Sequence, residues 1–79
     1  MSFESRLKLE PGQRLENRRM RTKGHLGETE IEEFDVVSAA GDKVGRVTYT
    51  EHTQVRGLKT THHVEQYDST GQVVVDQRW

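Results

Sequence analysis

The chain has 79 residues, with 12 Lys and Arg, 13 Asp and Glu, a formal net charge of −1 and a hydrophobic content of 30%. This length allows one small domain, and no stretch is long and apolar enough for a transmembrane helix. Cysteine is absent, which excludes a disulfide framework, a thiolate metal site and a cysteine nucleophile. Because the N-terminus MSFESRLKLE lacks the apolar segment of a signal peptide, we expect a cytoplasmic protein with no membrane partner.

The charges are distributed unevenly along the chain. Residues 1–25 carry seven bases and three acids, whereas residues 26–79 carry five bases and ten acids. Such asymmetry is typical of a basic arm that binds nucleic acid, or of one that pairs with acids of its own chain or of a neighbouring subunit. We expect pairing with protein acids and keep nucleic-acid binding as the alternative.

The whole chain is predicted to form a single domain, residues 1–79, with three zones. Residues 1–13 form an N-terminal tail, irregular or with a short helix, that contains the single proline in a stretch typical of a turn. Residues 14–27 form a basic arm or a first strand. Residues 28–79 form a β-meander.

The basic zone is compatible with two local structures. Residues 12–22 can be a short helix that begins after Pro11, or they can be a strand. Leu15 and Met20 are the apolar residues of this stretch, and their spacing makes a poor helical stripe. We therefore favour a strand that pairs with residues 29–38 through a connection over 24–27, so that opposite charges face each other across the pair.

Residues 28–79 are predicted to be β-strands separated by turns that contain Gly41, Gly57 and Gly71. The intervening segments are rich in Val, Thr, Tyr and Phe, which favour strands. Because each short connection joins sequence neighbours, the simplest fold is all-β, an antiparallel meander of four or five strands that is twisted or partly barrel-like. Besides the N-terminal strand, we expect strands over about 29–38, 43–53, 58–68 and 72–79.

A faint internal repeat aligns residues 34–47 with residues 64–77. Both segments run from an apolar residue and an acid, through small residues and a glycine, into a second strand. Duplication of a hairpin explains the repeat, and so does the general similarity of any two hairpins with glycine turns.

Strand alternation places most apolar residues on one face of the predicted sheet, and that face needs a second layer. The N-terminal zone shows no amphipathic stripe that would supply one. The sheet is therefore expected to curl into a barrel or to pack against another copy, with a two-fold homodimer as the default symmetry. The predicted contact residues are Val73, Val75 and Trp79.

Histidines of the predicted strands are the candidates for a metal site. His52 and His62 could share one face of a hairpin beside a carboxylate, which is a metal-ligand set. The adjacent His62 and His63 point to opposite faces, and an ordered spacing such as HExxH is missing. We therefore expect no metal and no cofactor, and keep His52 and His62 as the candidates to check.

Catalytic residues are not expected, because the chain has no cysteine and no GxSxG motif and is too short for a deep pocket. We predict a non-enzymatic protein-binding or assembly module, such as a small phage- or plasmid-borne accessory protein. The alternative is a nucleic-acid-binding regulator that uses residues 14–23, although this segment lacks the aromatic residues on which bases stack. The bases predicted to bind a partner are Arg14, Arg18, Arg19, Arg21 and Lys23.

Overall fold

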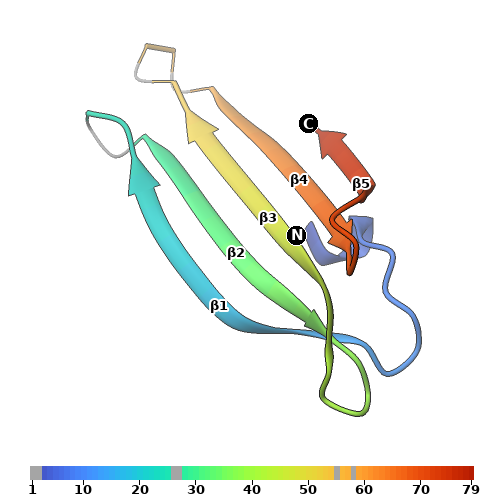
Figure 1. Cartoon of the computed structure of the whole chain (residues 1–79). Helices are drawn as coiled ribbons and strands as arrows, with labels where there is room; N and C mark the ends of the chain where they lie inside the picture. The colour runs from blue at the N-terminus through green and yellow to red at the C-terminus, as the bar shows by residue number, and fades with distance from the viewer. Residues whose placement is uncertain (1–2, 26–27, 55, 58) are drawn as a thin grey trace.

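The computed structural model describes residues 3–25, 28–54, 56–57 and 59–79 and shows an all-β chain (Figure 1). A short 3-10 turn, η1 (Phe3–Arg6), precedes five strands. The strands are β1 (Arg14–Lys23), β2 (Thr29–Val37), β3 (Lys43–Thr53), β4 (Thr60–Asp68) and β5 (Val73–Arg78). Hydrogen bonds join them in the order β1-β2-β3-β4-β5, and every pair is antiparallel. The predicted meander is confirmed.

The N-terminal basic zone is a strand and not the short helix over 12–22, and it pairs with β2 as favoured from the sequence. The predicted strands elsewhere agree with β2 to β5 within two residues where these are described. Residues 26–27 of the predicted connection 24–27, Val55 of the turn that contains Gly57, and Leu58 of the strand 58–68 lie outside the described residues, as do residues 1–2 of the tail.

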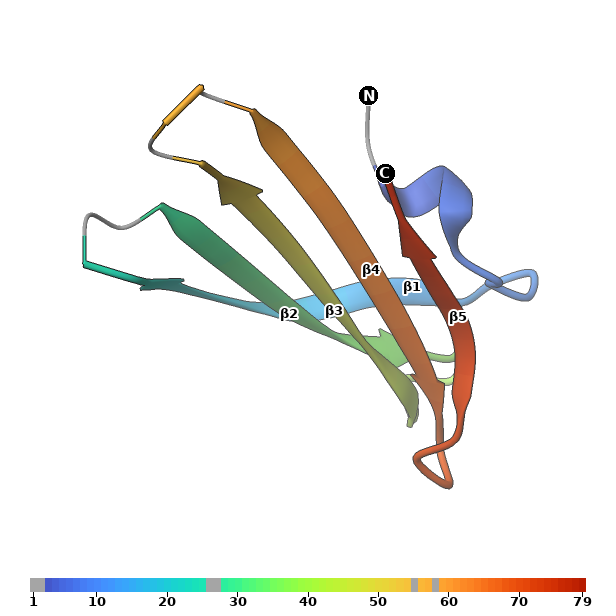
Figure 2. The same ribbon diagram turned by 90° about the horizontal axis from the view of Figure 1, so that it is seen from above.

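The sheet is twisted and curved, and it stays open, with β1 and β5 as its two edges (Figure 2). Its partly barrel-like curvature brings the N-terminal segment beside β5 in this view. The described residues include no helix with the length and hydropathy needed to cross a lipid bilayer.

A small valine core lies on one face of the sheet. Each strand from β2 to β5 contributes one residue to it, and the four are Val36, Val47, Val64 and Val75. They share a face because side chains alternate along a strand and the antiparallel register aligns the alternation from strand to strand. Val47 and Val64, on the two central strands, are fully buried.

Residues 3–9 of the predicted tail cover this core and supply the second layer. Phe3, Leu7 and Leu9 pack against the valines. Two hydrogen bonds fix the segment, because the side-chain amide of Gln66 accepts from Lys8 N at 2.8 Å and donates to Lys8 O at 2.9 Å. The expectation that only barrel closure or a second copy could cover the apolar face is therefore wrong. The covering residues lie in an irregular segment, which has no periodicity to reveal them.

The hairpins β2–β3 and β4–β5 end in the same kind of turn. In the first turn Ser38 N donates to Asp42 O at 2.8 Å and Gly41 N donates to Ser38 O at 2.9 Å. Residues 68–72 form the equivalent pair of bonds, at 2.9 and 3.0 Å. The repeat seen in the sequence therefore extends to the hydrogen bonds of the backbone.

Each of these hairpins also contains an irregularity at the equivalent place. The register shifts between Val36 and Val37 in the first hairpin and between Gln66 and Tyr67 in the second. An extra residue at such a position bends the strand and increases its local twist. The two bulges therefore contribute to the curvature that wraps the sheet around residues 3–9.

Candidate functional site

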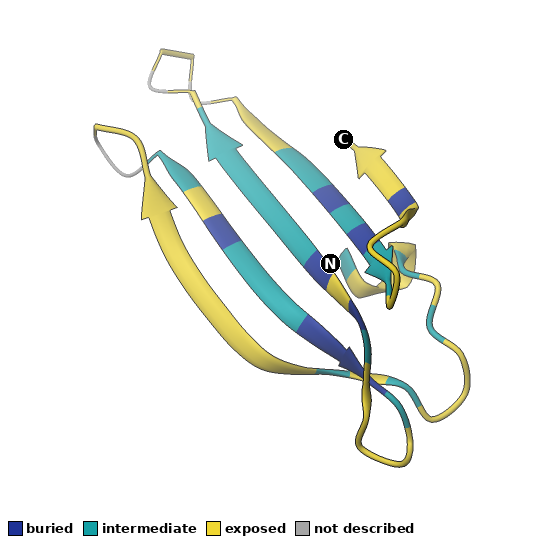
Figure 3. Cartoon of the chain, viewed as in Figure 1, coloured by how far each residue is buried: buried dark blue, intermediate teal, exposed yellow. Residues whose placement is uncertain are grey.

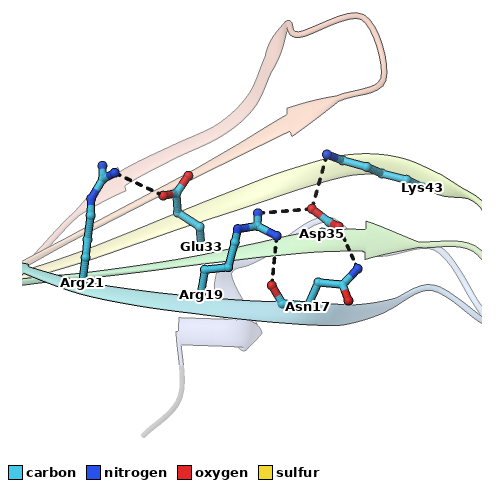
Figure 4. A network of polar contacts seen from close by, with 6 residues as sticks. All are labelled: Asn17, Arg19, Arg21, Glu33, Asp35 and Lys43. Carbon is cyan, nitrogen blue, oxygen red and sulfur yellow. Dashed lines mark hydrogen bonds and ion pairs between the residues drawn. The ribbon is translucent and has the colours of Figure 1, made fainter.

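The basic strand β1 lies along the acidic strand β2, and its arginines pair with acids of the same chain (Figure 4). Arg18 Nε lies 2.7 Å from Glu32 Oε2, and Arg21 Nη1 lies 3.7 Å from Glu33 Oε1. Exposed pairs of this kind contribute about 0.2–1 kcal/mol each. Their larger effect is on register, because shifting β1 along β2 would bring these bases away from their acids.

Asp35 is the centre of the polar network on this part of the sheet (Figure 4). Its carboxylate accepts from Asn17 Nδ2 at 2.9 Å and pairs with Arg19 and Lys43, each at 3.3 Å. The hydrogen bond from Asn17, together with these two cations, lowers the pKa of Asp35 below its ordinary value of 3.8 against the opposing effect of desolvation. Asn17 reaches the carboxylate from a register shift in β1, where its backbone has a φ of 57°.

The two remaining bases lie at the ends of β1. Arg14 pairs with Glu16 and also donates to Ser38 O at 3.1 Å. Lys23 is exposed and lies opposite Thr29. Four of the five bases singled out in the sequence therefore contact acids of their own chain.

The opposite edge of the sheet, β5, carries exposed apolar residues beside polar ones. Val73 is 51% exposed, Val74 is 36% exposed and Trp79 is 38% exposed. Val75, which was predicted to contact a partner, is only 5% exposed, because its side chain belongs to the valine core. The edge therefore presents Val73, Val74 and Trp79, while Val75 holds the strand to the molecule.

Trp79 is held by contacts of its ring with Arg6 and His62. The guanidinium carbon of Arg6 lies 3.9 Å from the ring centroid, and His62 stacks on it at 5.2 Å. Its backbone N and O bond to O and N of His62 at 3.0 and 2.8 Å. On the neighbouring strand β3, Tyr49 OH bonds to His62 Nδ1 at 2.7 Å. Burial, together with the nearby charge of Glu51, raises the pKa of Tyr49 to about 12.

The predicted pairing of His52 and His62 on one face is wrong. His52 lies opposite Thr61 in the β3–β4 ladder, so that its side chain points to one face and that of His62 to the other. His52 Nδ1 instead bonds to Thr29 Oγ1 at 2.6 Å. The two histidines cannot bind one metal ion, because the sheet separates them.

A different histidine has carboxylates on both sides. His63 Nε2 lies 2.7 Å from Asp76 Oδ1, and His63 Nδ1 lies 3.9 Å from Glu65 Oε1. One potential ligand atom from each of these residues lies within 4.8 Å of the others. The sequence signal was present as His and Glu at alternate positions of one strand, but Asp76 could be added only once the register of β5 was known.

A groove of about 360 Å³ lies between residues 8–13 and the turn end of the sheet. Its lining is mostly apolar and includes Leu9, Val44 and Val74. The buried amide of Gln66 also lines it, but both of its polar atoms are bonded to the backbone of Lys8. This amide therefore serves the packing of the N-terminal segment.

Comparisons with known protein families, with curated proteins and with solved structures found no match to this chain.

Proposed function

We propose that this chain is a non-enzymatic assembly module that pairs with a second copy of itself through the β5 edge. The observation that carries the proposal is the position of its exposed apolar side chains. Among the residues that the structure describes, four large hydrophobic side chains are exposed, and three of them, Val73, Val74 and Trp79, lie on β5 or directly after it. An apolar edge strand is a template for pairing with another strand.

The backbone of β5 is oriented for such pairing. Because Trp79 N and O both bond to β4, strand alternation directs the backbone groups of Gln77 toward β4 as well. The groups of Asp76 and Arg78 then point away from β4, toward the outer edge. The side chains of these two residues are exposed.

Charge complementarity favours a second copy as the partner. Two β5 strands that run antiparallel around a two-fold axis at Gln77 place Asp76 of each copy opposite Arg78 of the other. Opposite charges at facing positions stabilise a strand pair. The other edge cannot pair in this way, because two β1 strands would bring two rows of bases together (Figure 3 shows β1 exposed along most of its length). Like charges on an edge strand prevent such pairing.

Nucleic-acid binding through residues 14–23 is less well supported. Phosphates would have to displace Glu32, Glu33 and Asp35 from the arginines that they contact, and the same acids would repel the polyanion. The lack of cysteine supports a cytoplasmic location for the proposed assembly.

The proposal is tested by sedimentation equilibrium over a range of micromolar concentrations. We expect a reversible dimer for the parent chain, and a monomer for Gln77→Lys, which places two like charges opposite each other at the two-fold axis. Met20→Lys is the matched control, because Met20 is 48% exposed on β1, and it should dimerise like the parent.

A charge exchange sharpens the test. Asp76→Arg and Arg78→Asp should each weaken the dimer, and the double variant should restore it, because the facing pair is then reversed but still complementary. A single-chain mass for the parent at every concentration would overturn the proposal. So would a dimer that is lost in Met20→Lys and kept in Gln77→Lys.

A further inference from the structure

We propose that His63, Glu65 and Asp76 form a binding site for a divalent transition-metal ion, with Zn²⁺ as the best fit. The site lies on the open face of the sheet, the side opposite the valine core, and shares Asp76 with the edge contact proposed above. It is formed by residues of one chain and requires no second copy.

The strand geometry brings the three side chains together. His63 and Glu65 occupy alternate positions of β4 and therefore point to the same face, while Val64 between them points into the core. Asp76 lies directly opposite Glu65 in the β4–β5 ladder. Three ligands on two paired strands are held by the backbone hydrogen bonds of the ladder, so that little order is lost when a metal ion binds.

The ligand atoms are close to the spacing that a metal ion requires. Bonds of zinc to imidazole nitrogen and carboxylate oxygen are about 2.0–2.2 Å long, so that two ligands of one ion lie about 3 Å apart. His63 Nε2 and Asp76 Oδ1 are 2.7 Å apart. Glu65 Oε1 lies nearest the other ring nitrogen, at 3.9 Å from Nδ1, so that the side chain of His63 or Glu65 must rotate for all three ligands to surround one ion.

The chemistry of the donor set selects the class of ion. One imidazole nitrogen and two carboxylates balance the charge of a divalent cation, and imidazole favours zinc and its neighbours over magnesium and calcium. The remaining coordination positions face solvent, where water can fill them. Tyr67 OH donates to Glu65 Oε2 at 2.9 Å, which holds one oxygen of this carboxylate and leaves Oε1 for the ion, as a supporting hydrogen bond does in many metal sites.

One neighbouring charge opposes the ion. Arg78 lies opposite His63 in the ladder, and its guanidinium is a cation next to the proposed site. Removing this charge should increase the metal affinity, whereas removing any of the three ligands should decrease it. The opposite signs distinguish a specific site from general attraction of cations to an acidic protein.

Isothermal titration of the full chain with zinc chloride tests the proposal. We expect one ion per chain, a loss of affinity of about tenfold or more in His63→Gln and in Asp76→Asn, and tighter binding in Arg78→Gln. His52→Gln is the matched control, because His52 lies on the same face but has Thr29 as its partner, and its affinity should equal that of the parent.

Circular dichroism of each variant ensures that a loss of binding does not reflect unfolding, and Asp76→Asn keeps the test informative if His63→Gln fails to fold. His63 does not contribute to the β5 edge, so that its substitution separates metal binding from assembly. The proposal is overturned if the parent binds no zinc, if it binds magnesium as tightly as zinc, or if His52→Gln weakens binding as much as His63→Gln does.

Discussion

The hairpins β2–β3 and β4–β5 have the same turn and the same bulge, but they carry different residues at the equivalent position after the bulge. This position is Gly45 in the first hairpin and Val75 in the second. A Cβ atom at Gly45 would collide with the backbone oxygen of Tyr67 on the neighbouring strand β4. Val75 has a strand on one side only, since β5 is an edge.

The difference between Gly45 and Val75 shows that two properties of a bulge have separate causes. One is the path of the backbone, and the other is the size of the side chain that fits after the bulge. The turn and the bulge follow from local features that the two hairpins share, above all the glycine of the turn, which has a positive φ in both. The size of the residue after the bulge follows from whether another strand lies close on its second side. Substitutions at equivalent positions of the two hairpins can separate these causes.

The largest effect is expected at Gly45. Gly45→Ala should lower the free energy of unfolding by about 3 kcal/mol, because the new methyl group must push apart two hydrogen-bonded strands. Urea denaturation of the variant and the parent, compared at one protein concentration, measures the difference. A variant as stable as the parent would mean that β3 and β4 can separate at this point without cost.

The reverse experiment removes volume from the second hairpin. Val75→Ala should cost about 2 kcal/mol, because it leaves a cavity in the valine core. Val73→Ala is the control on the same strand, and its effect should stay within about 0.5 kcal/mol, as expected of an exposed residue. Equal losses in the two variants would contradict the assignment of Val75 to the core.

Replacing the turn glycine by alanine should destabilise the two hairpins equally. Gly41 and Gly71 have φ angles of 93° and 86°, and an added Cβ would meet no atom within 4 Å at either position. Gly41→Ala and Gly71→Ala should therefore each cost about 1 kcal/mol, from backbone strain alone. Unequal costs, measured by urea denaturation, would show that one turn bears a constraint that the other lacks.

The smallest difference concerns acid stability. Asp68 Oδ1 accepts hydrogen bonds from Thr70 Oγ1 at 2.6 Å and from Gln72 N at 3.0 Å, whereas Ser38 occupies the equivalent place in the first turn. These bonds, led by that from Thr70, lower the pKa of Asp68 below its ordinary value of 3.8. The stability they provide is therefore present above pH 3.8 and is lost as the pH falls through the lowered pKa.

Asp68→Ser should remove this part of the pH dependence. Ser38→Asp should introduce a smaller part in the first turn, because Ala40 has no hydroxyl to replace that of Thr70. The measurement is the denaturation midpoint as a function of pH below neutrality. Asp35, whose pKa is also lowered, should leave a residual acid dependence in both variants. An acid profile of Asp68→Ser identical to that of the parent would exclude a role for this carboxylate.

The strands could be predicted from the sequence because alternation and glycine turns are local signals. The pairing of the basic strand with β2 followed as well, since the acids of one segment match the bases of the other. The cover formed by Phe3, Leu7 and Leu9 could not be predicted, because an irregular segment has no period and its contacts lie far along the chain. The residues of such a segment do not reveal, by their local pattern, which distant part of the sheet the segment covers.

The candidate sites depend on the register of the strand pairs. A shift of one residue moves a side chain to the other face of the sheet. His52 and His62 fall on opposite faces because His52 lies opposite Thr61, a distinction that an estimate of the turn length could not make. The grouping of Asp76 with His63 also required the bulge in the second hairpin to be known. The exposed β5 edge was anticipated, but the burial of Val75 within it was not.

The hydrogen bonds between Lys8 and Gln66 join residues 58 positions apart, whereas the meander connects each strand to its neighbour in sequence. Closing a long loop costs more conformational entropy than closing a hairpin, and contacts between distant residues slow folding. We therefore expect docking of residues 3–9 to come late, after the strands have paired. Until that step the valine face is in contact with water, so that refolding yield should decrease as the protein concentration rises.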